Sequence, residues 1–254
     1  MPWTERQREM LLEIGLRVWQ PAVVRPAAAQ IPVQAAVQAP VNLQVGTMTE
    51  GAVESPPAAA LDWPALRETV AACRACRLCE SRKQTVFGVG HARAHWMVVG
   101  EAPGAQEDEQ GEPFVGAAGQ LLDAMLRALG LSRAEDGDAA DRVYIANALK
   151  CRPPGNRNPQ PDELQRCEPF LVRQIELVRP KLILAMGRFA VQALLRTSEP
   201  IGRLRGRAHR YQGVPLVVTY HPAYLLRNLP DKARAWEDLC LAAELVQGGA
   251  QAAA

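Results

Sequence analysis

The sequence predicts a three-layer α/β/α domain with a central parallel sheet of about four strands. Within residues 61–247, segments with a helical spacing of apolar residues alternate with short strand-like runs. These runs are almost continuously apolar, which is typical of parallel strands covered by helices on both faces. The expected strands are 95–100, 143–148, 182–186 and 215–220. The expected helices are 64–73, 116–130, 161–178, 188–196 and 232–247.

The segments on either side of this domain have a different composition. Residues 1–20 carry Met10, Leu11, Ile14 and Val18 on one face of a predicted amphipathic helix. Residues 21–60 contain eleven Ala, six Pro, three charged residues and no aromatic residue, which predicts a disordered linker. Residues 248–254 are rich in Ala and Gly, and we expect them to fray.

Composition bounds the classes of function. The 254 residues have a formal net charge of +2, so overall charge does not indicate nucleic-acid binding. No apolar run reaches the roughly 18–20 residues that a membrane span needs, and the charged start is unlike a secretory signal. We expect a cytoplasmic, nucleoid-associated monomer without a membrane partner. In a reducing compartment, six cysteines favour metal ligands or buried thiols over disulfides.

Two loops directly follow predicted strands and carry groups suited to chemistry. The loop Gly100–Gly104 contains Glu101 and follows the first strand, and His221 begins a loop after the last strand. Ligands of parallel α/β sheets bind at the carboxyl ends of the strands. We therefore expect the Glu101 carboxylate and the His221 imidazole to face one pocket. Asn147 lies in the apolar run of the second strand, where an amide is costly to bury without a partner.

Five cysteines have a spacing that predicts a metal centre: Cys73, Cys76, Cys79, Cys151 and Cys167. A C-x2-C turn supplies two thiolates, and the fold must bring in the others. An all-thiolate site suits an iron–sulfur cluster or zinc. We favour Cys73, Cys76, Cys151 and Cys167 as ligands, and Cys79 is an open alternative. Buried structural thiols are the competing interpretation, which fits Cys240 in its apolar helix.

Seven ordered segments carry a specific resemblance. They are Cys73–Leu78, Val86–Gly88, Val99–Gly104, Pro113–Leu122, Ile145–Asn147, Lys150–Pro154 and His221–Arg227. Together they resemble the family 4 uracil-DNA glycosylases, the iron–sulfur branch found in bacteria and archaea. The likeness spans about residues 65–245 and leaves the first sixty residues outside.

The resemblance implies a function and a cofactor. It implies a repair glycosylase that flips uracil out of DNA and hydrolyses the N-glycosidic bond, leaving an abasic site. It also implies a structural [4Fe–4S] cluster at the four favoured cysteines. A non-catalytic iron–sulfur protein that binds nucleic acid is the alternative. A relative that cross-links covalently to DNA is disfavoured because no His lies between 96 and 208.

The resemblance also implies roles for residues in the pocket. Phe114 stacks on uracil, and the Asn147 amide accepts from N3–H and donates to O4, a pattern that cytosine cannot satisfy. His221 donates to uracil O2 as negative charge develops there. The backbone at Gly100 and Ala102 contacts the base.

The sequence offers several groups that could activate the attacking water. Glu101 is the leading candidate to position or activate the attacking water. Family 1 enzymes carry Asp where this chain has Ala102, so the acid they use is missing here. Glu107, Asp108 and Asn156 are reserve candidates, and a solvated acidic loop is the alternative for the first two.

Two further groups are candidates for DNA contact. In the family, the loop containing Tyr224, Leu225, Leu226 and Arg227 wedges into the duplex. The competing interpretation is a helical turn packed on the core. Strand alternation would place Arg203, Arg205 and Arg207 on one face for phosphate contacts, unless they form a solvated edge. Arg152 and Arg157 are candidates for the same role.

The N-terminal segment 1–20 is a candidate docking element. Leu11, Ile14-Gly15-Leu16 and Trp19 resemble the peptide by which the psi subunit of bacterial DNA polymerase III docks on the clamp loader. We therefore hypothesise weak docking to a replisome component, with the linker raising local concentration. A helix that packs on its own domain is the alternative.

Overall fold

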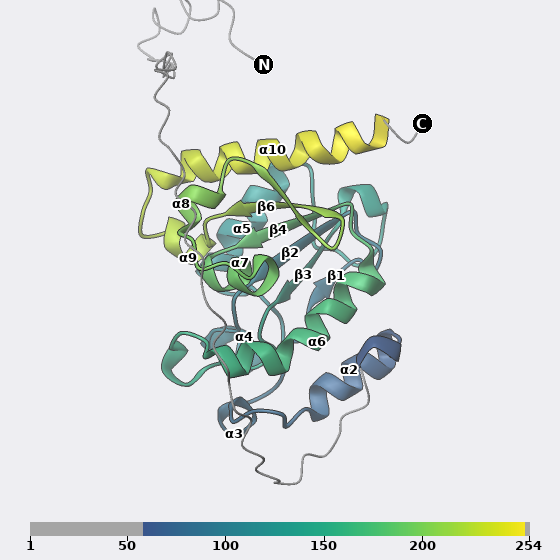
Figure 1. The fold of residues 1–254 in the computed structure, drawn as a ribbon, viewed down its shortest axis with the longest axis vertical. Coiled ribbons are helices and arrows are strands. Elements are labelled where there is room, and N and C mark those ends of the chain that lie inside the picture. Colours follow the sequence, from purple (N-terminus) through teal and green to yellow (C-terminus); the bar gives the residue numbers. More distant parts are fainter. Residues whose placement is uncertain (1–57, 252–254) are drawn as a thin grey trace, which may run out of the picture. The chain divides into compact units, whose positions relative to one another are not determined.

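The fold is built on one six-stranded sheet, seen in a computed structural model that describes residues 58–251. The sheet order is β1-β3-β2-β4-β6-β5 (Figure 1). The strands are β1 (Val89–Gly90), β2 (Trp96–Gly100), β3 (Val143–Asn147), β4 (Leu182–Met186), β5 (Ala208–Tyr211) and β6 (Val214–Thr219). The four inner strands are parallel, which confirms the predicted parallel sheet. The short edge strands β1 and β5 are antiparallel and were not predicted.

Helices connect the strands. The longer ones are α2 (Trp63–Ala72), α5 (Ala117–Ala128), α6 (Pro161–Val178), α7 (Arg188–Leu195) and α10 (Asp231–Gln251). The short ones are α3 (Leu78–Ser81), α4 (Ala105–Gln110), α8 (Ile201–Leu204) and α9 (Pro222–Leu225), with 3-10 turns η1 (Ala58–Ala60), η2 (Ala139–Asp141) and η3 (Pro154–Asn156). Each predicted long helix is present within a few residues of its expected ends.

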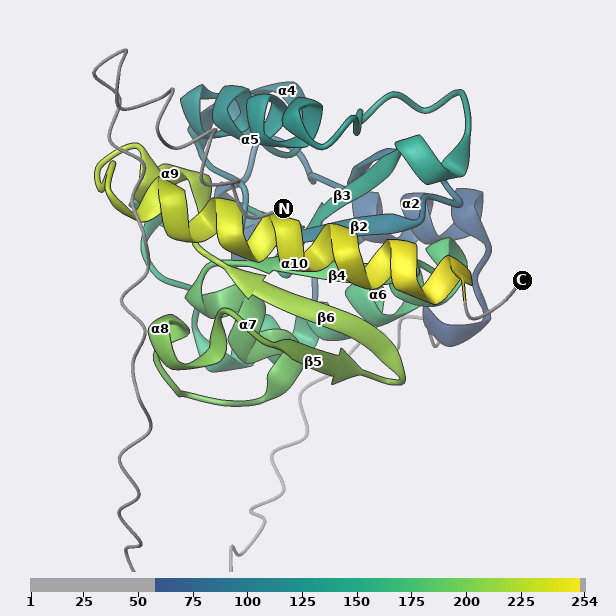
Figure 2. The same cartoon turned by 90° about the horizontal axis from the view of Figure 1, so that it is seen from above.

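Alternate side chains along each strand pack on opposite faces of the sheet. Met97, Val99 and Ile183 pack against α6 and α7 on one face. Val98 and Leu184 pack against α5 and α10 on the other. In Figure 2, α10 crosses in front of the strands, while α6 and α7 lie behind them. Covering both faces explains why all five residues of β2, β3 and β4 are buried.

A third, smaller core lies beside the sheet, around the cysteine segments. Leu66 and Val70 of α2 and Leu78 of α3 pack there against Phe170 of α6. Ala58 is buried in the same core, although the sequence analysis places residues 58–60 in the linker. The predicted helix 1–20 and most of the linker lie outside the described residues.

Two further segments differ from the prediction. Helix α10 continues beyond 247 to Gln251, into the segment predicted to fray, where the sequence has no proline to end the helix. Residues 203–207 are not a strand with three arginines on one face. Arg203 lies in α8, and the chain enters β5 only at Ala208.

The predicted phosphate contact of Arg205 is also corrected by its surroundings. Its guanidinium donates to Asp238 at 3.0 Å, and Gly206 N–H donates to the other oxygen of the same carboxylate at 3.0 Å. The Arg205 side chain is only 14% exposed, and that of Asp238 is 0% exposed. The ion pair therefore ties the chain after α8 to α10 and leaves the guanidinium little freedom to meet DNA.

The strand register places the site. Gly100 lies opposite Asn147 in the β2–β3 pair, and Met186 lies opposite Thr219 in the β4–β6 pair. The carboxyl ends of the four parallel strands are therefore level at one edge of the sheet. Among residues 58–251, no helix is long and apolar enough to cross a membrane.

Candidate functional site

A cavity of about 880 Å³ opens at the carboxyl edge of the parallel strands. Every inner strand contributes to its wall. Glu101 follows β2, Asn147 ends β3, Gly187 follows β4, and His221 comes shortly after β6. The predicted pocket residues Ala102 and Phe114 also line this cavity. Gly100 lies behind the Asn147 and Phe114 side chains that line it. The structure therefore places Glu101 and His221, which the strand-end rule grouped, in one cavity with Asn147, which the family resemblance added.

Asn147 presents an unusual buried amide. The residue is 2% exposed, and its side-chain oxygen Oδ1 has no hydrogen-bond partner among the described residues. A buried amide oxygen without a partner costs about 1–3 kcal/mol, so an unmet acceptor beside a cavity indicates a ligand group. A Cβ built on Gly100 would lie 2.3 Å from Oδ1, so only glycine leaves room at this position.

Phe114 forms a second wall of the cavity. The residue has a positive φ of 56° and is 5% exposed, so it is held in the left-handed region by its surroundings. Its ring stacks on the His221 ring with centroids 5.3 Å apart and planes at 27°. Its Cζ would lie 2.7 Å from a Cβ on Gly100. The Phe114 ring and the Asn147 amide therefore converge above Gly100, and the His221 ring stacks on the Phe114 ring.

His221 has a defined tautomer. It caps α9, and Ala223 N–H donates to its Nδ1 at 3.2 Å. Since Nδ1 is the acceptor, the neutral ring carries its proton on Nε2 and can offer that N–H to a ligand. Burial lowers the pKa of His221 to about 4, so the imidazole is neutral at physiological pH.

Glu101 is a carboxylate in a partly dry environment. Burial raises its pKa to about 6, and the nearby positive charge of Arg188 opposes the rise. The backbone around it is fixed, because Leu149 N–H donates to the Glu101 carbonyl at 3.0 Å. A carboxylate with a pKa close to neutral is suited to accept a proton from water.

The reserve candidates have structural partners. Glu107 accepts from Gly104 N–H and Val115 N–H, both at 3.1 Å, and so joins the two loops beside the cavity. Asp108 is 2% exposed, and Lys83 N–H donates to both of its oxygens. The Asn156 side chain accepts from Arg152 at 2.7 Å. Because these bonds occupy all three groups, Glu101 remains the strongest candidate.

Comparison with known proteins gives this cavity a context. Residues 87–240 match the model of the uracil DNA glycosylase superfamily. The chain belongs to this superfamily. The Type-4 uracil-DNA glycosylase of Pyrobaculum aerophilum is 42% identical over 191 residues, which cover 71% of this chain and 93% of that protein. The predicted resemblance to family 4 is thereby confirmed.

Other type-4 members of the superfamily are similar to the same degree. The protein of Archaeoglobus fulgidus is 44% identical over 165 residues, covering 62% of this chain and 79% of its own. That of Thermotoga maritima is 42% identical over 169 residues, covering 66% and 84%. A type-5 enzyme of Pyrobaculum aerophilum is 36% identical over 149 residues, so the type-4 branch is the more similar one.

The predicted wedge segment forms the short helix α9 and its exit. Leu225 is 1% exposed and packs inward, which corrects its placement on a DNA-facing surface. The Tyr224 hydroxyl donates to Asp231 at 2.7 Å and anchors the segment to the start of α10. Leu226 is 42% exposed and Leu229 is 61% exposed. The apolar surface is therefore displaced toward the connection between α9 and α10, which a turn prediction alone does not reveal.

Four cations lie near the cavity with different degrees of freedom. Arg157 forms a two-pronged pair with Glu163, with contacts of 3.0 and 2.5 Å, and Arg152 bonds to Asn156. Arg227 and Arg188 line the cavity and have no ion pair within the described residues. Arg188 was not predicted as a site residue, although it follows closely on the predicted strand 182–186, and position after a strand is the signal that selected the other two loops.

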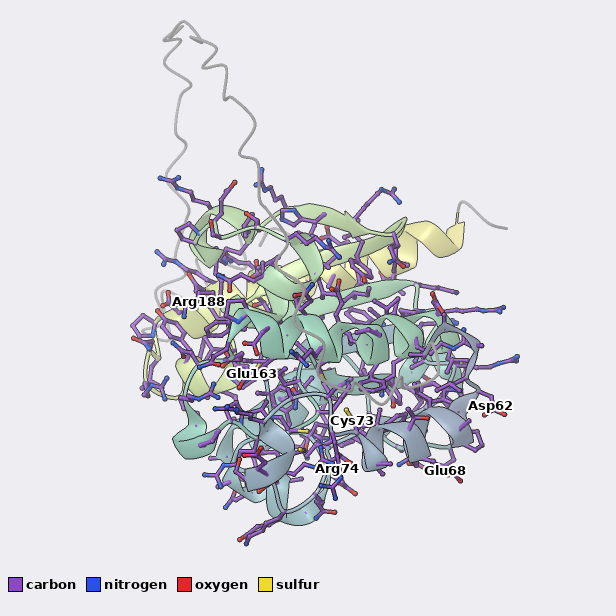
Figure 3. The ribbon with its side chains drawn as sticks, turned by 60° about the horizontal axis from the view of Figure 1, so that its bottom comes forward. Asp62, Glu68, Cys73, Arg74, Glu163 and Arg188 are labelled. Carbon is purple, nitrogen blue, oxygen red and sulfur yellow. The ribbon has the colours of Figure 1, made fainter. Side chains whose placement is uncertain are left out.

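The predicted cysteine ligands line one small cavity between α2, α3 and α6. Cys73, Cys76, Cys79, Cys151 and Cys167 all contribute to its wall. Sulfur atoms gather beside Cys73 in Figure 3. Arg82 donates to Cys151 Sγ at 2.9 Å, and Lys150 N–H donates to Cys167 Sγ at 3.3 Å. No three His, Cys, Asp or Glu side chains in the described chain group closely enough for a single-ion site.

We predict that His221 stays neutral from pH 8 down to about 5, with its proton on Nε2, because burial holds its pKa near 4. Two-dimensional ¹⁵N–¹H spectra of the imidazole groups measure both properties. The sequence holds four histidines, so His221→Gln identifies the signal. An imidazolium pattern at pH 6.5, or a proton on Nδ1, would contradict the prediction.

Proposed function

We propose that this chain is a uracil-DNA glycosylase that hydrolyses the N-glycosidic bond of deoxyuridine and leaves an abasic site for base excision repair. The proposal rests on the buried Asn147 oxygen, which has no hydrogen-bond partner within residues 58–251 and lies in the same cavity as the neutral His221. Membership of the superfamily and about 42% identity to type-4 enzymes support it.

Base selection follows from the amide of Asn147. Its Oδ1 can accept from uracil N3–H while its Nδ2 donates to O4. Cytosine presents an acceptor at N3 and a donor at N4, so both contacts would fail and leave the buried amide unsatisfied. The Phe114 ring supplies a stacking surface for the flipped base, and Gly100 leaves room for this ring and the Asn147 amide.

Bond cleavage is assisted by His221. As the bond between C1′ and N1 breaks, its electron pair moves onto uracil, and negative charge collects on O2. The neutral Nε2–H, held in place by the Nδ1 cap of α9, is a fixed donor that can meet this charge. Such a preorganised donor is typically worth about 3–4 kcal/mol.

Glu101 completes the reaction. The sugar becomes cationic at C1′ as uracil leaves, and an ionised carboxylate nearby stabilises that charge. Water then forms the new bond to C1′ and transfers a proton to the Glu101 carboxylate. The positive charge of Arg188 favours the ionised form of Glu101 before the reaction.

DNA contact is assigned to the rim of the cavity. Arg227 and Arg188 are the cations available for phosphate groups next to the flipped nucleotide. The exposed Leu226 is the apolar side chain best placed to fill the space that the base leaves. Arg152 and the partly exposed Arg157 extend the basic surface along the loop after β3, while keeping their internal partners.

The cysteine cavity is assigned to a [4Fe–4S] cluster. Four thiols from three separate segments face one space, and donors from Arg82 and Lys150 suit sulfurs that carry negative charge. We assign Cys73, Cys76, Cys151 and Cys167 as ligands, with Cys79 as the alternative fourth thiol. When bound, the cluster cross-links the segment before α3 to the loop after β3, which carries DNA-facing residues.

Single-turnover cleavage of a labelled oligonucleotide with one uracil tests the function. We expect alkali-labile product from the wild type, a loss of about 10²–10³ in rate for His221→Ala, and a comparable loss for Asn147→Ala. Melting temperatures serve as the folding control. No product from well-folded wild-type protein would overturn the proposal and favour a non-catalytic nucleic-acid-binding protein.

The pH profile tests the role of Glu101. Its folded pKa is about 6, so the active carboxylate is lost as pH falls through that value. We predict that kcat/KM decreases below about pH 6 and is level above it, because this parameter reports free-enzyme ionisation. Glu101→Gln should be slow and lack this limb. A limb that survives in Glu101→Gln would assign the titration to another group.

Cluster content is tested by chemical analysis of protein purified without oxygen. We predict iron and acid-labile sulfide in the wild type, and their loss with lowered stability in Cys167→Ser, because thiolates from separate segments no longer meet. Cys240→Ser is the matched control, since Cys240 lies in α10 outside the cysteine cavity. Zinc without sulfide in the wild type would contradict the assignment.

A further inference from the structure

Lys150 is a fully buried cation with neutral partners. The residue is 1% exposed, and its ammonium group donates to the backbone carbonyl of Asn147 at 2.8 Å and to Gln174 Oε1 at 2.6 Å. No carboxylate forms an ion pair with it within residues 58–251. Because the ammonium group contacts neutral acceptors, the geometry of these two hydrogen bonds, and not an ion pair, fixes its position.

Gln174 fixes the direction of the ammonium group. The residue is 0% exposed, and its Nε2 donates to the carbonyl of Phe87 at 2.9 Å and to the Tyr144 hydroxyl at 3.2 Å. Because a carbonyl only accepts, the amide nitrogen must face Phe87 and the amide oxygen must face Lys150. The Gln174 side chain therefore has one defined orientation, with its oxygen toward the Lys150 ammonium group.

The network holds the peptide that carries the uracil-reading side chain. Ala148 N–H donates to the Gly100 carbonyl at 2.9 Å, so this side of the peptide faces β2. In a trans peptide the Asn147 carbonyl points the opposite way. The edge strand β1 pairs only with Tyr144 and Ile145, so it ends before reaching Asn147. The ammonium group of Lys150 supplies the hydrogen bond that a longer β1 would give to the Asn147 carbonyl.

Lys150 also contacts the cysteine cavity through its backbone. Its N–H donates to Cys167 Sγ, and the next residue is Cys151. One residue thus joins the cysteine segment, through its main chain, to the end of β3, through its side chain. The lysine is in position to transmit the geometry of one site to the other.

We propose that Lys150, oriented by Gln174, is a positioning residue that clamps the Asn147 peptide and so sets the angle of the amide that reads uracil. The inference rests on the proposed uracil-DNA glycosylase function. Without the ammonium group, the peptide is held on the β2 side alone. The Asn147 amide then tilts, and the contacts to N3–H and O4 lengthen together.

The test compares Lys150→Met, which keeps the length and removes the charge, with Lys181→Met, an exposed lysine on the amino-terminal side of β4. Two readouts are used: the single-turnover rate on uracil DNA, and the affinity for an oligonucleotide with 2′-fluoro-deoxyuridine, which resists hydrolysis. Iron content and melting temperature report the fold.

We expect Lys150→Met to keep its iron and fold and to lose at least about tenfold in rate and in affinity, since small misplacements cost rate steeply. Lys181→Met should match the wild type. In an Asn147→Ala background, Lys150→Met should change affinity less than twofold, because both substitutions remove one interaction.

Wild-type rate in Lys150→Met, or a full additional loss in the double variant, would overturn the inference while leaving the proposed function intact. An inactive wild type would instead overturn the function. If Lys150→Met does not fold, Gln174→Met decides, because it keeps the ammonium group and removes the acceptor that orients it. The loss of affinity caused by Gln174→Met must likewise disappear when it is combined with Asn147→Ala.

Discussion

The parallel pairing of β2 with β3 is the constraint on which the site depends. It sets Gly100 opposite Asn147, so that the glycine and the amide end their strands at the same level. Ala148 and Leu149 then continue the ladder to Gly100 and Glu101. A slip of one residue would turn the Asn147 side chain to the other face of the sheet and remove it from the cavity.

The groups expected to act on the substrate are buried groups whose hydrogen-bonding or charge requirements the free protein leaves unmet. Asn147 Oδ1 is buried without a partner in the described part of the chain, burial raises the pKa of Glu101, and burial lowers the pKa of His221. At neutral pH the unpaired amide oxygen and the buried carboxylate cost stability in the free protein. The lowered pKa of His221 costs stability only below about pH 6.5, where the unfolded chain would bind a proton. The two apolar cores on the faces of the sheet make such costs tolerable.

The sequence predicted the helices and strands whose limits depend on local residue patterns. Helix α6 has the predicted range 161–178, and β4 has the predicted range 182–186, because apolar periodicity, an N-terminal proline and a buried apolar run determine them. The rule that ligands bind at strand ends predicted one pocket for Glu101 and His221. The cysteine spacing predicted a metal centre, whereas the roles of Phe114 and Asn147 and the [4Fe–4S] type of the cluster came from the family resemblance.

What the sequence could not reveal depends on contacts between distant segments. Arg205 resembles a DNA-facing cation until Asp238, on a helix 33 positions later, is seen to bind it. Leu225 resembles an exposed wedge until α9 is seen to turn it inward. Lys150 and Gln174 are 24 positions apart, and no spacing rule joins them. The two wrong assignments and the missed contact share one cause, because burial and contacts between distant segments are set by the assembled fold and not by local sequence.

The convergence of the Asn147 amide and the Phe114 ring above Gly100 is the central claim, and Gly100→Ala tests it most directly. A Cβ there would lie 2.3 Å from Asn147 Oδ1 and 2.7 Å from Phe114 Cζ, so both groups must move. Gly248→Ala is the control, because a Cβ there meets nothing within 4 Å. The account predicts a loss of at least about 10² in single-turnover uracil excision for Gly100→Ala, as for other misplaced catalytic groups, with iron content and melting temperature near those of Gly248→Ala. Excision at the wild-type rate in a folded Gly100→Ala variant would contradict it.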